Sequence, residues 1–166
     1  MSKAVKVRPD QINDFLMAFI NDHWEDHHSV TKEIYEFIYQ QFPQFRYEGE
    51  GFRAVLNCNE TYNPNLNLEP FTCWSQSQVG IIHFLNHEIQ DQAFVEGDEC
   101  YILTGKVKGI NIPKIAQYLY SINLLNINQL NLFLKEEEVL NLYYVGEATQ
   151  AQYDFEAIEL AIKTIL

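Results

Sequence analysis

Apolar residues recur at helical spacing in five segments of the chain. In the first segment, DQINDFLMAFIND, they lie one turn apart after an aspartate suited to N-capping. Pro43 ends the second segment, and a proline stands at the start of the fourth, where a helix tolerates it. The spacing therefore predicts helices over residues 10–22, 30–41, 78–89, 112–122 and 154–166.

Extended segments separate these helices. YEGEGFRAVLNC at 47–58, FTCWSQS at 71–77 and ECYILTGKV at 99–107 have the short apolar runs and turn-rich flanks typical of strands. Residues 124–134 are apolar and Asn-rich without a clear period, and a strand is expected over residues 136–145. With no repeat, low-complexity tract or linker, the pattern predicts one α+β domain.

Composition limits the partners of such a domain. The 166 residues are enough for one sizeable core. The net charge is −12, from 23 acidic and 11 scattered basic residues. Because a groove along a phosphate backbone needs clustered cations, we expect no stable nucleic-acid binding, whereas a basic partner protein would be attracted.

Other familiar signals are missing from the sequence. The basic N-terminus has no sustained apolar core or cleavage site, and no apolar run reaches membrane-spanning length. We therefore expect a cytoplasmic protein without membrane contact. The sequence has no G-x-G-x-x-G, P-loop or G-x-S-x-G motif, which disfavours a Rossmann reductase, a P-loop NTPase and an α/β-hydrolase.

Cysteine and histidine spacing does not predict a metal site. Cys58, Cys73 and Cys100 are widely spaced and odd in number, so reduced and mostly buried thiols are expected. His23 and His27 have an i, i+4 spacing that can bind zinc on a helix, but a convincing third ligand is missing.

Three consecutive glutamates precede the last apolar run, in KEEEVLNL. If this segment is extended, Glu136 and Glu138 point to one face and Glu137 to the other. The functional interpretation is a pair of carboxylates sharing one site. The alternative is a solvated charge cluster that protects the start of a strand.

Two more polar signals lie in the earlier strands. Arg53 is inside the apolar GFRAVL, and Ser75 and Ser77 are in CWSQSQ. Taken singly, each has an ordinary explanation, since arginine is common at strand edges and serine is common near helix starts.

Together and in this order, these residues resemble the motifs of the Arg–Ser–Glu class of mono-ADP-ribosyltransferases. GFRAVLN matches the first-strand arginine, FTCWSQSQVGIIHFL matches the S-x-S strand followed by a helix, and EEEVLNL matches the E-x-E strand. The resemblance covers residues 47–145. The chain departs from the usual pattern in Ala54, where many members have glycine, and in the central Gln76 of the serine motif.

The resemblance implies an ADP-ribosyltransferase-like fold and an NAD site. Residues 1–46 would be N-terminal helices, residues 47–145 a two-sheet β core around the NAD cleft, and residues 146–166 a C-terminal helix. In the site, Glu138 would face the charge that develops on ribose, and Arg53 would hold the NAD phosphates.

The resemblance also suggests roles for the remaining site residues. Ser75 would contact the nicotinamide ribose, with Ser77 supporting the strand and contributing to the cofactor site. Glu136 would orient or deprotonate the acceptor. Phe94 is a candidate for stacking on nicotinamide, with an ordinary core phenylalanine as the alternative.

The expected function is NAD-dependent mono-ADP-ribosylation of an unidentified acceptor protein, with release of nicotinamide, in the producing or a receiving cell. Glutamate at the first position of E-x-E favours arginine as the acceptor residue. Hydrolysis of NAD would be a side activity or the main one. The alternative is an acidic, non-enzymatic interaction protein, or a catalytically silent version of the fold, that binds a basic partner. Convergence of Arg53, Ser75 and Glu138 on one cleft would favour the enzyme.

Overall fold

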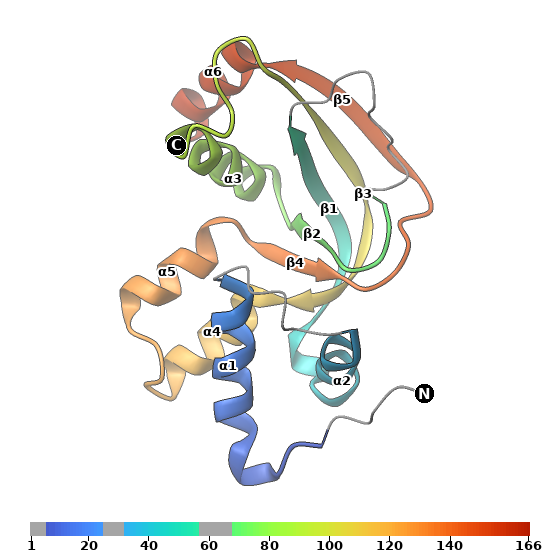
Figure 1. Cartoon of the computed structure of the whole chain (residues 1–166), viewed down its shortest axis with the longest axis vertical. Helices are drawn as coiled ribbons and strands as arrows, with labels where there is room; N and C mark the ends of the chain where they lie inside the picture. Colours follow the sequence, from blue (N-terminus) through green and yellow to red (C-terminus); the bar gives the residue numbers. More distant parts are fainter. Residues whose placement is uncertain (1–5, 25–31, 57–67) are drawn as a thin grey trace.

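One antiparallel sheet runs through the protein, with two groups of helices packed against it (Figure 1). The computed structural model describes residues 6–24, 32–56 and 68–166. In these ranges the strands are β1 (Arg46–Leu56), β2 (Thr72–Ser75), β3 (Glu99–Asn111), β4 (Glu138–Asn141) and β5 (Ala148–Asp154). The helices are α1 (Ile12–Trp24), α2 (Lys32–Gln41), α3 (Gln78–Gln90), α4 (Ile112–Ser121), α5 (Ile127–Lys135) and α6 (Phe155–Ile165), with short 3-10 turns at Pro9–Gln11 and Pro43–Phe45. The predicted α+β class is confirmed.

Strand pairing closes four of these strands into a ring. β1 pairs with β3 along its whole length. The other edge of β3 pairs with β5 over its first half and with β4 at its end. β4 pairs with β2, and β2 returns to β1 with Phe52 opposite Ser75. The expected two-sheet core is therefore corrected to one continuous sheet, because β3 is long enough to join both halves.

The helices cover different parts of this sheet. α1, α2, α4 and α5 surround one apolar core, which also takes in the ends of β3 and β4. α3 and α6 enclose a second core against β1 and β3. In Figure 1, β2 and β4 lie between the two helical groups. Burial of these apolar faces is the main force that fixes the strands carrying the site.

α5 occupies a segment in which the sequence pattern predicts no regular element. A capping box starts this helix, because Asn126 and Gln129 each accept a hydrogen bond from the other's backbone N–H. Leu130 and Phe133 then bury one face of the helix. The capping box was the available sequence signal.

The last two strands also differ from the prediction. The strand expected over residues 136–145 is limited to Glu138–Asn141, since Glu136 has helical backbone angles and Glu137 has a left-handed φ of 49°. β5 was not expected, because its ATQAQYD sequence is mostly exposed and lacks an apolar alternation. The other predicted helices and strands are confirmed, with shifted ends.

Within the described ranges, no helix combines the length and the apolar character that a membrane span requires. Cys73 is partly buried and Cys100 is fully buried, in agreement with the expectation of mostly buried cysteines. Cys58 lies outside the described residues.

Candidate active site

Residues from three neighbouring strands line one small cavity. Phe52 on β1 lies opposite Ser75 on β2, and Ser75 lies opposite Glu138 on β4. Cross-strand partners in such a row place their side chains close together. The cavity measures about 90 Å³, and its described lining consists of Arg53, Ser75, Glu136 and Glu138 with Phe52, Ala54, Cys73, Trp74, Ile81 and Phe84. Four predicted site residues therefore lie together.

Arg53 is held by the neighbouring strand. Its Nη1 donates a hydrogen bond of 2.8 Å to the backbone carbonyl of Cys73, beside the point where β1 meets β2. Burial lowers the pKa of Arg53, while Cys73 and Glu138 act in the opposite direction. Because a guanidinium remains protonated in proteins, the cavity contains a fixed positive charge.

Glu136 lies at the C-terminal end of α5, and its side chain lines two cavities. Its Oε1 is 3.3 Å from Nδ1 of His87 on α3, and its side chain is 25% exposed. Burial raises the pKa of Glu136, and the charge of Glu138 raises it further, whereas His87 opposes both effects. Besides the small cavity, Glu136 lines a pocket of about 260 Å³ formed by α3 and the end of α5. It is therefore placed between the charged cavity and a larger pocket.

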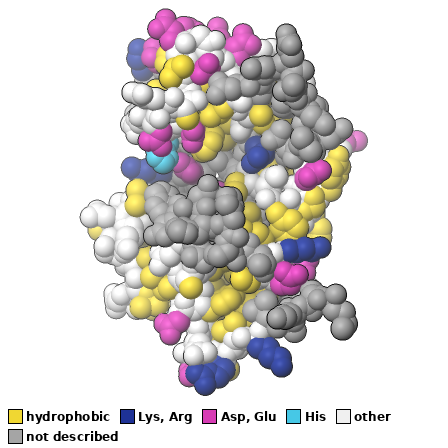
Figure 2. Space-filling view, viewed as in Figure 1, with side chains coloured by type: hydrophobic (Ala, Val, Ile, Leu, Met, Phe, Trp, Pro, Cys, Tyr) yellow, Lys and Arg dark blue, Asp and Glu magenta, His cyan; other side chains and the backbone are white. Residues whose placement is uncertain are grey.

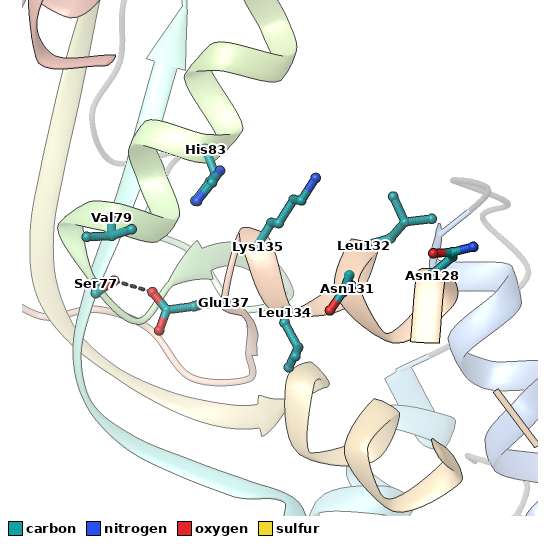
Figure 3. Close-up of a pocket in the computed structure, with 9 residues that line it drawn as sticks. All are labelled: Ser77, Val79, His83, Asn128, Asn131, Leu132, Leu134, Lys135 and Glu137. Carbon is teal, nitrogen blue, oxygen red and sulfur yellow. Dashed lines mark hydrogen bonds between the residues drawn. The ribbon is translucent and has the colours of Figure 1, made fainter. Parts of the chain in front are cut away.

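Glu137 and Ser77 belong to a different pocket. The Ser77 hydroxyl accepts a hydrogen bond of 3.2 Å from the Gly80 N–H, which caps α3, and it donates one to the Glu137 carboxylate. Both residues line a space of about 720 Å³ between α3 and α5, in which their side chains point toward each other (Figure 3). The described lining of the Arg53 cavity does not include Ser77, whose hydrogen bonds to Gly80 and Glu137 support the local structure. Glu137 is separated from Glu136 and Glu138, as predicted, although the backbone is not extended there.

Tyr35 is a neighbour of the cavity that the sequence analysis missed. Burial raises the pKa of Tyr35 to about 12, and Cys73 and Glu138 add to this shift. Its ring stacks on Phe71 with the centroids 5.7 Å apart. A tyrosine on the amphipathic α2 carries no sequence signal that links it to a motif about one hundred residues later.

Phe94 is enclosed in the core rather than exposed to a ligand. It is 0% exposed, and its ring centroid is 5.6 Å from that of Phe155. The ring belongs to the apolar cluster between α3, α6 and the sheet. This burial favours the alternative of an ordinary core phenylalanine over stacking on nicotinamide.

The candidate zinc pair cannot be placed. His23 falls within α1, but its side chain and all of His27 lie outside the described residues. In the part of the chain that is described, no group of three or more His, Cys, Asp or Glu side chains is arranged to hold a metal ion.

The donor set suits the reacting end of NAD, although the cavity is smaller than the whole molecule. Pockets for drug-sized ligands measure roughly 300–1,000 Å³, against about 90 Å³ here. An apolar pocket of about 520 Å³ shares Phe52 and Ile81 with the cavity, and the 260 Å³ pocket shares Glu136. A cation, a hydroxyl and two carboxylates can bind phosphate and ribose groups, and the rest of the dinucleotide would extend outside this cavity.

Figure 2 shows acidic side chains in several places on one face of the molecule, with Lys and Arg side chains dispersed among them.

Comparisons of the chain with protein-family models, with curated proteins and with solved structures gave no match.

Proposed function

We propose that this protein is an NAD-dependent mono-ADP-ribosyltransferase that modifies a protein acceptor, with arginine as the favoured acceptor residue. One observation carries the proposal: Arg53, Ser75, Glu136 and Glu138 line a single cavity. These residues come from separate segments of the chain, in the order that resembles the Arg–Ser–Glu motifs. Buried charges are costly, so their assembly in one place favours a functional site over a fold that needs only an acidic surface.

Three of these side chains act in the first half of the reaction. The bond between ribose C1′ and the nicotinamide nitrogen breaks, its electron pair leaves with neutral nicotinamide, and positive charge develops on the ribose. The Glu138 carboxylate faces that charge and accepts a hydrogen bond from the 2′-hydroxyl. Arg53 binds the phosphates through its planar set of donors, and Ser75 contacts the nicotinamide ribose.

Glu136 serves the second half. A guanidine nitrogen of the acceptor forms a new bond to C1′, and its proton passes to the Glu136 carboxylate. The raised pKa of Glu136 makes it a stronger base than an ordinary carboxylate. Its position next to the 260 Å³ pocket lets an acceptor side chain approach without entering the NAD cavity. When water replaces the acceptor, the products are ADP-ribose and nicotinamide.

The decisive experiment is incubation of the purified protein with labelled NAD and a cell lysate, beside Glu138→Gln and the exposed control Glu147→Gln. We expect the wild type and Glu147→Gln to transfer label to a protein and to release nicotinamide. Glu138→Gln should lower both rates by about 100- to 1,000-fold, because one charge that stabilises the transition state is lost. Its thermal unfolding should remain close to that of the wild type.

Two results would overturn the proposal. Full activity of Glu138→Gln would remove Glu138 from the reaction. The other result is a wild type that shows no transfer, no nicotinamide release and no saturable NAD binding. The protein would then be a catalytically silent fold or a binding protein, and salt-sensitive capture of a basic partner would identify the binding protein.

A further inference from the structure

We propose that Glu137, the central glutamate of the three, is a positioning residue that orients Glu136 and Glu138 by fastening their turn to the start of α3. This inference rests on the proposed function for its catalytic consequence. The fastening itself is a property of the fold and can be measured without any NAD chemistry.

The backbone of Glu137 is in a conformation that glutamate disfavours. α5 ends at Lys135, Glu136 is its C-cap, and Glu137 follows with a φ of 49°. Helices commonly end with a left-handed residue at this position, and glycine is the usual choice because it has no Cβ. A glutamate here indicates that its side chain provides an interaction that glycine would lack.

That interaction joins the turn to α3 at several points. The Glu137 carboxylate accepts a hydrogen bond from the Ser77 hydroxyl, and the Glu137 carbonyl accepts one of 3.0 Å from the Gln76 N–H. The carbonyl oxygen of Glu136 lies only 2.6 Å from the position that a Cβ on Gly80 would occupy. The turn therefore rests directly on the first turn of α3, and Gly80 makes this approach possible.

The fastened turn determines where the other two glutamates point. Glu136 and Glu138 line the cavity with Arg53, while Glu137 lies in the pocket on the α5 side (Figure 3). Without the Glu137 carboxylate, the backbone of residues 136–138 keeps fewer bonds to α3. The two cavity carboxylates would then sample more orientations, and misplacement of a catalytic group by about 1 Å can lower a rate by about 100-fold.

Glu137→Gly removes the carboxylate and leaves a residue that readily adopts the left-handed backbone conformation of this position. Glycine accepts the left-handed φ, so the variant should keep or raise the melting temperature while losing the bond to Ser77. We expect its kcat for NAD cleavage to fall about tenfold, with KM for NAD within about threefold of the wild type. Glu137→Gln, whose amide oxygen can still accept from Ser77, should retain at least about half of the wild-type kcat.

Ser77→Ala tests the other end of the bond. It should lower kcat to the same degree, and the double variant Ser77→Ala/Glu137→Gly should be no slower than Ser77→Ala alone, since both changes remove one interaction. The matched controls are Ser121→Ala and Glu156→Ala, which alter exposed helix-terminal residues away from the cavity and should leave kcat unchanged. An unchanged kcat in Glu137→Gly, or a double variant that multiplies the two losses, would overturn the positioning role.

Hydrogen exchange gives a readout that is independent of activity. In Glu137→Gly the Gln76 amide should exchange about tenfold faster than in the wild type, because its acceptor, the backbone carbonyl of residue 137, then belongs to a turn that has lost its side-chain bond to Ser77. The Leu142 amide, which donates to the Lys108 carbonyl at 3.0 Å, should keep its rate. If the wild type does not cleave NAD, the proposed function fails, and Gln76 exchange alone decides whether the fastening exists. Unchanged exchange at Gln76 would overturn it.

Discussion

Two cavities that share a wall differ in the charge of their lining. The Arg53 cavity measures about 90 Å³, and its lining contains one cation, two carboxylates and a hydroxyl beside apolar side chains. The neighbouring space between α3, α6 and the sheet measures about 520 Å³ and is lined mainly by apolar residues, including Ile158. Phe52 and Ile81 belong to both linings.

The contrast favours the smaller, charged cavity over the larger, apolar one as the candidate reactive site. Ionisable groups buried beside one another are costly, so a fold retains them where their chemistry is used. Apolar walls arise wherever amphipathic helices meet a sheet, and their contribution is stability. We therefore expect changes in the apolar cavity to alter unfolding and changes in the charged cavity to alter NAD chemistry.

Ile158→Ala should produce the largest effect on stability. Ile158 on α6 is 2% exposed, and truncation of a buried isoleucine typically costs about 2–4 kcal/mol of unfolding free energy. Urea unfolding measures this loss, with Leu160→Ala as a control because Leu160 on the same helix is 66% exposed. KM for NAD should stay within about twofold. A large rise in KM without loss of stability would place substrate in the apolar cavity. The division of roles between the charged and the apolar cavity would then be wrong.

Arg53→Lys should affect the other cavity. Lysine keeps the charge but loses the planar set of donors, so KM for NAD should rise about 10- to 100-fold, as expected for lost hydrogen bonds to charged groups. Steady-state kinetics measure this change. Arg8→Lys is the matched control, since Arg8 is exposed and lies outside the cavity lining. An unchanged KM would mean that Arg53 has a structural role, such as its hydrogen bond to the Cys73 carbonyl, rather than a role in NAD binding.

Strong amphipathic patterns made much of this fold predictable. The helices at both ends of the chain and the long strand β3 follow from apolar periodicity, because these elements bury one face. β5 escaped prediction because it is an exposed edge strand whose partner, β3, determines its conformation. Continuity of the sheet also depends on long-range pairing, which local pattern does not encode.

The candidate site residues could be selected from the sequence only through a resemblance. The order and surroundings of Arg53, Ser75 and Glu138 resemble the Arg–Ser–Glu motifs, and strand pairing brings the three residues to one cavity. Tyr35 could not be selected, since only tertiary packing brings α2 near Glu138. Phe94 was a candidate for stacking on nicotinamide because of its loop position, with a core role as the alternative, and its complete burial favours the core role.

The pH dependence of the unfolding free energy should also distinguish the charged cavity from the apolar one, by a smaller effect than those of the substitutions above. In the folded protein, burial and the charge of Glu138 raise the pKa of Glu136 above its ordinary value. Protonated Glu136 therefore favours the folded state. This contribution is fully present below the ordinary carboxyl pKa and is lost as pH rises through the raised one.

Glu136→Gln removes that contribution, because glutamine has no charge to desolvate. Its unfolding free energy minus that of the wild type should therefore become more positive as pH rises from about 4 to 6. Urea unfolding of both proteins across this pH range measures the difference. Contributions from unrelated titrating groups are the same in both proteins and cancel in it. Ile158→Val in the apolar cavity should instead lose about 0.5–1.5 kcal/mol at every pH. A flat difference for Glu136→Gln would indicate that the His87 contact offsets burial, and would place Glu136 on the solvated side of the charged cavity.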